Sequence, residues 1–354
     1  MATDRGLQLD RRRFLQSAGT VFATSLWPSR AEALDASEAL FAAAIVRGDG
    51  SYGVSIFNER GQVAHEIDLP SRGHDIIANP ATGDTVAFAR RPGTFAAVFD
   101  RHSAKSPHLI SSAQGRHFYG HGTFSTDGRL LYATENDYDN AVGKIGIYDA
   151  TSGYTRLGEF DSFGIGPHEV ALMPDGKTLL VANGGIETHP DYGRQKLNLT
   201  TMRSTVAKID LTSGHLKSLH SLPASATRLS LRHCAVGADG TAYLGGQTQT
   251  GGRSQQAIIW KLTDAGDLSQ FSIEPAAVAA LKGYTSSIKL SHNAQRIGVT
   301  SSIGEVMVQI DLRKMRSTVR SMRTMGAIMR HGSGFSTPNK IQAAIVDNHG
   351  LTLR

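Results

Sequence analysis

Apolar and polar residues alternate in many short segments of this chain, and the segments recur in a fixed order. The first half of each unit is a tight turn followed by an apolar run, as in STDGRLLYATEN, MPDGKTLLVANGG and GADGTAYLGGQ. The second half is an alternating segment that ends in a polar turn, as in KIGIYDATSG and VAKIDLTSG. Alternation with a period of two is typical of strands with one buried face, and Gly, Asp and Asn suit tight hairpin turns. The pattern therefore predicts an all-β protein built from hairpins.

Successive units start roughly 45 to 65 residues apart, which is the length of a four-stranded propeller blade. The chain contains six full units, together with an N-terminal half that a C-terminal half would complete. This count predicts a seven-bladed β-propeller. A β-sandwich would explain the short strands but not the repeated order of the turns. The 38 glycines among 354 residues and the lack of a long helical pattern agree with a fold rich in turns.

The N-terminal segment has the pattern of an export signal. It contains adjacent arginines followed by Phe14 and Leu15, a mildly apolar stretch to Trp27, and then Ala31-Glu32-Ala33. These features predict a twin-arginine signal peptide over residues 1–33 and a single propeller domain over residues 34–354. The alternatives are a membrane anchor, for which the stretch is short and rich in Ser, Thr and Gly, and a basic helix of a cytosolic protein. We expect a periplasmic protein that is exported in the folded state, with no membrane span after cleavage.

Charge and cysteine content narrow the class of partner. Loss of residues 1–33 removes five arginines and three acidic residues, so the formal charge of +6 falls by two. Outside the signal, basic residues form a run only between Arg313 and Arg330, so nucleic acid is not an expected partner. Cys234 is the single cysteine, which excludes an internal disulfide, and we expect it to be a buried thiol rather than a metal ligand.

Histidines occur at equivalent places in the repeated units. His74, His121, His168, His233 and His331 each lie roughly six to nine residues before the turn of their unit, where the remaining unit has Ser286 and Ser287. The first strand of each blade lines the propeller axis, so equivalent positions in different blades become neighbours. Such a partial ring of imidazoles is suited to iron, copper or zinc. We therefore predict a transition metal site, with Glu169 as a further ligand or as a partner that orients the imidazoles.

Polar segments after the second strands are expected to open on the same face. They include Glu135 and Asn136, and a long insertion from Asn183 to Met202 that has the appearance of a lid. The same histidines can equally be structural, because some propellers use a repeated histidine to hydrogen-bond the blade. No nucleophile elbow, phosphate-binding loop, His-Glu-x-x-His or Cys-x-x-Cys motif is present, which weakens the case for an enzyme.

Three long motifs carry a resemblance to a known family. GRHFYGHGTFSTDGRLLYATENDYD, GIGPHEVALMPDGKTLLVANGGIETHPDYGRQKLNLTTM and LSLRH resemble the domain of unknown function 1513, a family of exported bacterial proteins with a propeller-like fold. The resemblance implies no established activity. It implies a link to iron acquisition, with imelysin-like or other periplasmic iron-uptake proteins as partners. The positions that fall in the motifs, and from which we predict cofactor-binding residues, are Glu135, Asn136, Asn183, His189, Arg194 and Arg232, together with the expected ligands His121, His168, Glu169 and His233.

Three functions stay open at this level. The first is a propeller that binds a metal ion or a metal-bearing ligand at its histidine-lined mouth, as an accessory of iron uptake. The second is a hydrolase or lyase for a small polar substrate, in which one histidine acts as general base and Arg232 or a metal stabilises the developing anion. The third is a metal-free module that binds another protein through its loops.

Overall fold

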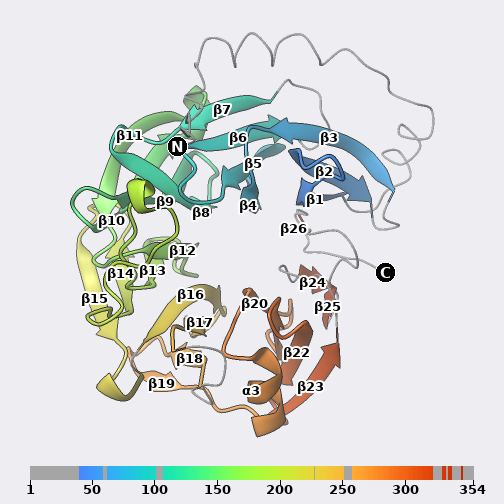
Figure 1. Ribbon diagram of the computed structural model, residues 1–354, viewed down its shortest axis with the longest axis vertical. Coiled ribbons are helices and arrows are strands. Elements are labelled where there is room, and N and C mark those ends of the chain that lie inside the picture. Colours follow the sequence, from blue (N-terminus) through green and yellow to red (C-terminus); the bar gives the residue numbers. More distant parts are fainter. Residues whose placement is uncertain are drawn as a thin grey trace, which may run out of the picture.

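The computed structural model describes residues 40–58, 62–100, 107–226, 228–250, 257–321, 329–331, 334–336 and 344–345. Six four-stranded antiparallel sheets form a ring around a common axis, and Figure 1 shows them following one another in chain order. The all-β propeller prediction is therefore confirmed. The expected signal at residues 1–33 lies outside the described residues. No helix in the part of the chain that the structure describes is long and apolar enough to cross a membrane.

Each of the second to sixth blades is one continuous stretch of chain. The strands of these blades, in order from first to fourth, are β4 (Gly73–Ala78), β5 (Asp84–Ala89), β6 (Phe95–Asp100) and β7 (His108–Ser111); β8 (Arg116–Phe124), β9 (Leu130–Asp137), β10 (Val142–Asp149) and β11 (Thr155–Asp161); β12 (Pro167–Leu172), β13 (Thr178–Asn183), β14 (Thr205–Asp210) and β15 (Leu216–Ser221); β16 (Leu229–Val236), β17 (Ala242–Thr248), β18 (Ile259–Leu262) and β19 (Leu268–Gln270); and β20 (Ser287–Leu290), β21 (Arg296–Ser301), β22 (Val306–Asp311) and β23 (Arg316–Ser321).

The first blade joins the two ends of the propeller. It contains β26 (Ala344–Ile345), β1 (Leu40–Val46), β2 (Tyr52–Asn58) and β3 (Val63–Leu69) in that order. Phe41 pairs with Ile345 and Ala42 with Ala344. The short hairpin of β24 (Met329–His331) and β25 (Gly334–Ser336) forms a separate two-stranded sheet.

The prediction of seven blades was wrong, because the described strands form six four-stranded sheets. The count expected a further blade made from an N-terminal half and a C-terminal half in addition to six full units. Instead, β26 pairs with β1, so the two ends of the chain share one of the six sheets.

The hydrophobic core lies between neighbouring sheets. Between the second and third blades, for example, Phe88 packs edge to face on Phe118, with ring centroids 5.6 Å apart, and Tyr148 joins the same cluster. The fourth strands are more exposed, as the burial patterns of β15 and β23 show. This arrangement leaves the first strands β4, β8, β12 and β16 next to one another around the axis (Figure 1). Cys234 is a buried free thiol in the cluster shared by the fourth to sixth blades.

Candidate functional site

The first strands of four consecutive blades are interrupted where the repeated histidines lie. The pairing register shifts between Gly73 and Ile76 in β4, between Phe118 and Gly122 in β8, between Pro167 and Glu169 in β12, and between Leu231 and His233 in β16. His74, His121 and His168 fall inside the interrupted stretches, and His233 directly follows the skipped residue Arg232. A β-bulge bends its strand and redirects the side chains beside it. The pairing of β20 with β21, where Ser287 replaces the histidine, shows no shift.

The four interruptions bring four imidazoles into contact. The ring centroids of His74 and His121, of His121 and His168, and of His168 and His233 are each 4.8 Å apart. The ring centroids are only slightly farther apart in two further pairs, at 5.6 Å for His74 and His168 and 5.5 Å for His121 and His233. We call these four residues the histidine quartet. The side chain of His331, the fifth predicted member, lies outside the described residues.

Two carboxylates contact the Nδ1 atoms of quartet rings. Nδ1 of His121 lies 3.1 Å from Oδ2 of Asp75, and Nδ1 of His233 lies 2.8 Å from Oε2 of Glu169. Glu169 also faces Lys289, whose Nζ is 3.7 Å from Oε1. In each pair the carboxylate engages Nδ1, which leaves Nε2 of the ring directed elsewhere. Nε2 of His121 lies 3.2 Å from Nε2 of His74.

Burial and neighbouring charges divide the quartet into two kinds of imidazole. Burial, reinforced by His121, lowers the pKa of His74 and of His168 far below its ordinary value, so both rings are neutral at pH 7. Burial also lowers the pKa of His233, against the opposing effect of Glu169. Burial acts on His121 in the same direction, but the adjacent Asp75 outweighs it and raises the pKa of His121. The pKa of Asp75 falls to about 2, because His121 outweighs the effect of burial on that carboxyl.

Gly120 makes room for the quartet. It has a φ of +105°, a conformation that other residues rarely adopt, and a Cβ at this position would lie 2.4 Å from Cδ2 of His74. The tight approach of β8 to the His74 ring therefore depends on a residue without a side chain.

The quartet has the donor atoms of a transition metal site. His74, His121 and His168 form one possible ligand group, and His121, Glu169 and His233 form another, with ligand atoms within 4.8 Å of one another in each. For metal–nitrogen bonds of about 2.1 Å, the 3.2 Å between the Nε2 atoms of His74 and His121 corresponds to an angle of about 100° at the ion. Nδ1 of His168 is buried without a hydrogen-bond partner among the described residues. A buried imidazole nitrogen without a hydrogen-bond partner is suited to a metal ion, and the donor set as a whole could hold one.

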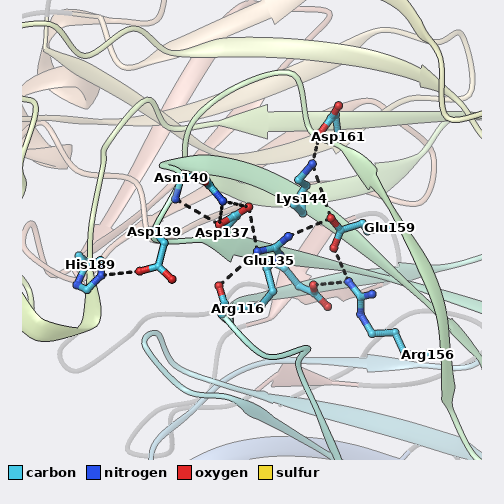
Figure 2. Close-up of polar contacts among 11 residues, drawn as sticks. Arg116, Glu135, Asp137, Asp139, Asn140, Lys144, Arg156, Glu159, Asp161 and His189 are labelled. Carbon is cyan, nitrogen blue, oxygen red and sulfur yellow. Dashed lines mark hydrogen bonds and ion pairs between the residues drawn. The ribbon is translucent and has the colours of Figure 1, made fainter.

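Glu135 lies elsewhere, in an ion-pair network across the third blade. The predicted loop at this place is the end of β9, and Glu135 is fully buried there. It accepts hydrogen bonds from the Tyr148 hydroxyl at 2.5 Å and from Arg156 at 2.9 Å. Figure 2 shows how Glu159 links Arg156 to Arg116 and Lys144 in the same network. Glu135 is therefore bound by side chains of its own blade, and none of these contacts involves the quartet.

Three other predicted residues make contacts that hold loops. Asn136 donates to the Thr188 carbonyl at 3.0 Å and faces Nε2 of His117 at 3.1 Å. Asn183 donates to the Ser162 carbonyl at 2.8 Å. His189 accepts from the backbone N–H of Asp191 at the start of η2 (Pro190–Tyr192) and pairs with Asp139, as Figure 2 shows.

The insertion from Asn183 to Met202 is anchored at its base. Asn198 donates to the Gly185 carbonyl at 2.9 Å, and its side-chain oxygen accepts from Glu187 N at 2.8 Å. The predicted residue Arg194 lies in the exposed part of this insertion. The described contacts at the base indicate an ordered loop.

Arg232, the skipped residue of β16, belongs to a group of cations beside the quartet. It lines a small pocket together with Arg91, Tyr119, Ser230 and His168. Burial, together with nearby Arg91 and Arg194, lowers the pKa of Arg232 to about 10. Burial and Arg194 act on Arg91 in the same way. The positive charges of these side chains therefore lie close enough to repel one another.

The sequence reasoning missed Asp75 and Arg91. Asp75 directly follows His74, as Glu169 follows His168, so the repeated His-acid pair was a signal that could have found it. Arg91 follows the end of β5 and has no counterpart in the repeated motifs, so only the folded structure shows that it meets Arg232.

A six-bladed β-propeller with a buried histidine quartet at its axis defines the class of this protein. Its sequence matches the family described as Protein of unknown function (DUF1513) over residues 67–347, and the chain belongs to that family. The predicted resemblance is thereby confirmed. No curated protein sequence matches the chain. Among solved structures it is similar to Kuenenia stuttgartiensis hydrazine synthase, with 15% identity, a TM-score of 0.56, and coverage of 77% of this chain and 76% of the other. That likeness concerns the fold alone.

Proposed function

We propose that this protein binds a transition metal ion, or a ligand that carries one, through the histidine quartet. The observation that carries the proposal is the convergence of four imidazoles from four blades, each beside an interruption of its strand. Burying four imidazoles together, two of them held neutral, gives little stability by itself. A shared ion would make use of their lone pairs and replace the missing partner of His168.

The carboxylate contacts support specific roles in this proposal. Asp75 and Glu169 engage the Nδ1 atoms of His121 and His233, which is how carboxylates commonly orient metal-binding imidazoles. His74, His121, His168 and His233 would supply nitrogen ligands, and Glu169 would orient His233 or contact the ion itself. Four nitrogen donors favour iron, copper or zinc over magnesium or calcium.

We further propose that the site operates in the periplasm as an accessory of iron acquisition. The arginine pair and the Ala31-Glu32-Ala33 sequence support export, and the resemblance to exported proteins linked with iron supports the process. Imelysin-like or other periplasmic iron-uptake proteins are the partners that this role implies.

Elemental analysis of the untagged protein, purified from the periplasmic fraction, tests the site. We expect close to one equivalent of iron, copper or zinc in the wild type, and loss of this metal in the H121A/H168A double variant. The control is H215A, because His215 is an exposed histidine outside the quartet. Circular dichroism would establish that the double variant is folded. Metal that persists in the folded double variant, or a wild type that neither carries nor takes up these metals, would refute the proposal.

A further inference from the structure

A small pocket adjoins the quartet on the side of Arg232. Its polar lining consists of Arg91, Tyr119, His168, Ser230 and Arg232, and Ile186 lies among them. The space enclosed by the lining is small, at about 10 Å³, and the rest of the hollow is open to solvent. A cavity of that size holds about one water molecule. A larger group would therefore sit at the open mouth of the pocket, against the lining side chains.

The two arginines of the pocket lack anionic partners. Among the described residues, neither guanidinium forms an ion pair with a carboxylate, and the only side-chain contact of Arg232 is a 3.3 Å hydrogen bond from Nε to the Ser230 hydroxyl. Both side chains are partly buried. A buried or half-buried guanidinium normally has a carboxylate or carbonyl partner, because its five N–H groups need acceptors. Two of them in one pocket leave a strong local excess of donors and positive charge.

Other cations lie near the two arginines of the pocket. Arg194 and Lys196 come from the anchored insertion, and Arg90 precedes Arg91. Mutual repulsion accompanies burial in lowering the pKa of Lys196 and of Arg90, which places these groups near Arg91, Arg194 and Arg232. Glu187 lies in the same region and affects Tyr119, so the surroundings are not free of negative charge. Five cations against this one carboxylate still leave an excess that attracts an anion.

Backbone elements narrow the pocket around its donors. Gly166 and Gly184 belong to the lining. A Cβ at Gly184 would lie 2.6 Å from the Ser230 hydroxyl, and a Cβ at Gly166 would lie 3.0 Å from the Ile186 carbonyl. Glycine at these positions keeps space open between the segment that precedes β12 and the segment that follows β13.

We propose that this pocket binds a small oxyanion, a carboxylate or phosphate group, between the guanidinium groups of Arg91 and Arg232. The planar guanidinium can donate two parallel hydrogen bonds to such a group. The hydroxyls of Tyr119 and Ser230 are additional donors in the lining. The site goes beyond the proposed metal function and needs no metal, because the arginines do not take part in the quartet.

Calorimetric titration with two probes, inorganic phosphate and citrate, tests the proposal on the mature protein after treatment with a chelator. We expect saturable binding of at least one probe. R91Q and R232Q should each weaken that binding at least tenfold, and R91K should weaken it less than R91Q because it keeps the charge. The matched control is R129Q, since Arg129 is an exposed arginine on the third blade. Circular dichroism of each variant identifies those that are folded.

The outcomes separate this proposal from the metal site. Binding of phosphate or citrate by metal-free protein, weakened by R91Q or R232Q but not by H121A, whose side chain does not line the pocket, supports the oxyanion pocket even if no metal ever binds. A preference for phosphate over citrate, or the reverse, would identify which oxyanion source the pocket accepts. Absence of binding by folded wild type overturns the proposal, and so does binding that R91Q, R91K and R232Q leave unchanged.

Discussion

Arg156 is expected to stabilise the protein because it is a partner of a fully buried carboxylate. Its Nη2 lies 2.9 Å from Oε2 of Glu135 (Figure 2). The other carboxylate oxygen of Glu135 accepts a hydrogen bond from the Tyr148 hydroxyl at 2.5 Å. Burial raises the pKa of Glu135 despite both partners. The R156M variant keeps much of the apolar stem but leaves the carboxylate with one neutral donor.

The expected loss of stability in R156M follows from the geometry of this ion pair. Removing one partner of a buried ion pair typically costs about 3–5 kcal/mol of stability. The Arg156 side chain is 24% exposed, so water can replace part of its contribution, and we expect a loss of about 2–3 kcal/mol. The E135Q/R156M double variant no longer buries a charge, and it should recover most of that loss.

Urea unfolding of the mature protein measures these differences, provided that the transition is reversible and its slope is unchanged. The matched control is K144M, because Lys144 contacts Glu159 and Asp161 in the same network but has no fully buried partner. It should cost less than about 1 kcal/mol. The reasoning fails if R156M costs no more than K144M, or if adding E135Q makes R156M still less stable. Metal content should be unchanged in folded R156M, since neither contact of Glu135, with Tyr148 or with Arg156, involves the quartet.

Two further predictions concern the quartet and the turns. G120A should destabilise the protein by roughly 1–3 kcal/mol through backbone strain, and it should reduce metal content because the new Cβ would displace His74. G158A is the control, since a Cβ at Gly158 meets nothing within 4 Å. A stable G120A variant with full metal content would contradict the role of Gly120. Hydrogen bonds from the Ser125 hydroxyl and the Arg129 amide lower the pKa of Asp127, and those from the amide and hydroxyl of Ser213 lower the pKa of Asp210. Each carboxylate therefore stabilises the fold above its unfolded pKa near 3.8. This stability disappears as the pH falls through the lower pKa of the folded state. The difference in unfolding free energy between wild type and D127N/D210N should therefore be largest near pH 6 and shrink below about pH 3, and a difference independent of pH would exclude this linkage.

The repeat pattern predicted the strands and the neighbourhood of the histidines for a clear physical reason. Turn residues and alternation are local signals, and equivalent positions in successive blades are neighbours in any propeller. The blade count failed because it depends on pairing between β26 and β1, which are far apart in the chain. No local pattern records which distant half completes a blade.

Side-chain partners were harder to predict than positions. Glu135 and Glu169 both follow from the motifs, yet Glu135 turns to Tyr148 and Arg156 whereas Glu169 contacts His233. The strand register decides which way each carboxylate points, and the bulge before Glu169 alters that register locally. The cationic pocket was not predicted as a unit, because Arg91 and Arg232 do not occupy equivalent positions of the repeat.

The pairing of β26 with β1 has a consequence for synthesis of the protein. Phe41 and Ala42 meet residues that the ribosome adds about 300 positions later. The second to sixth blades are continuous in the chain and can form as they emerge, but the first sheet lacks its innermost strand until Ala344 and Ile345 have been added. A chain that stops before these residues would therefore expose the edge of β1, and an exposed strand edge can pair with other chains.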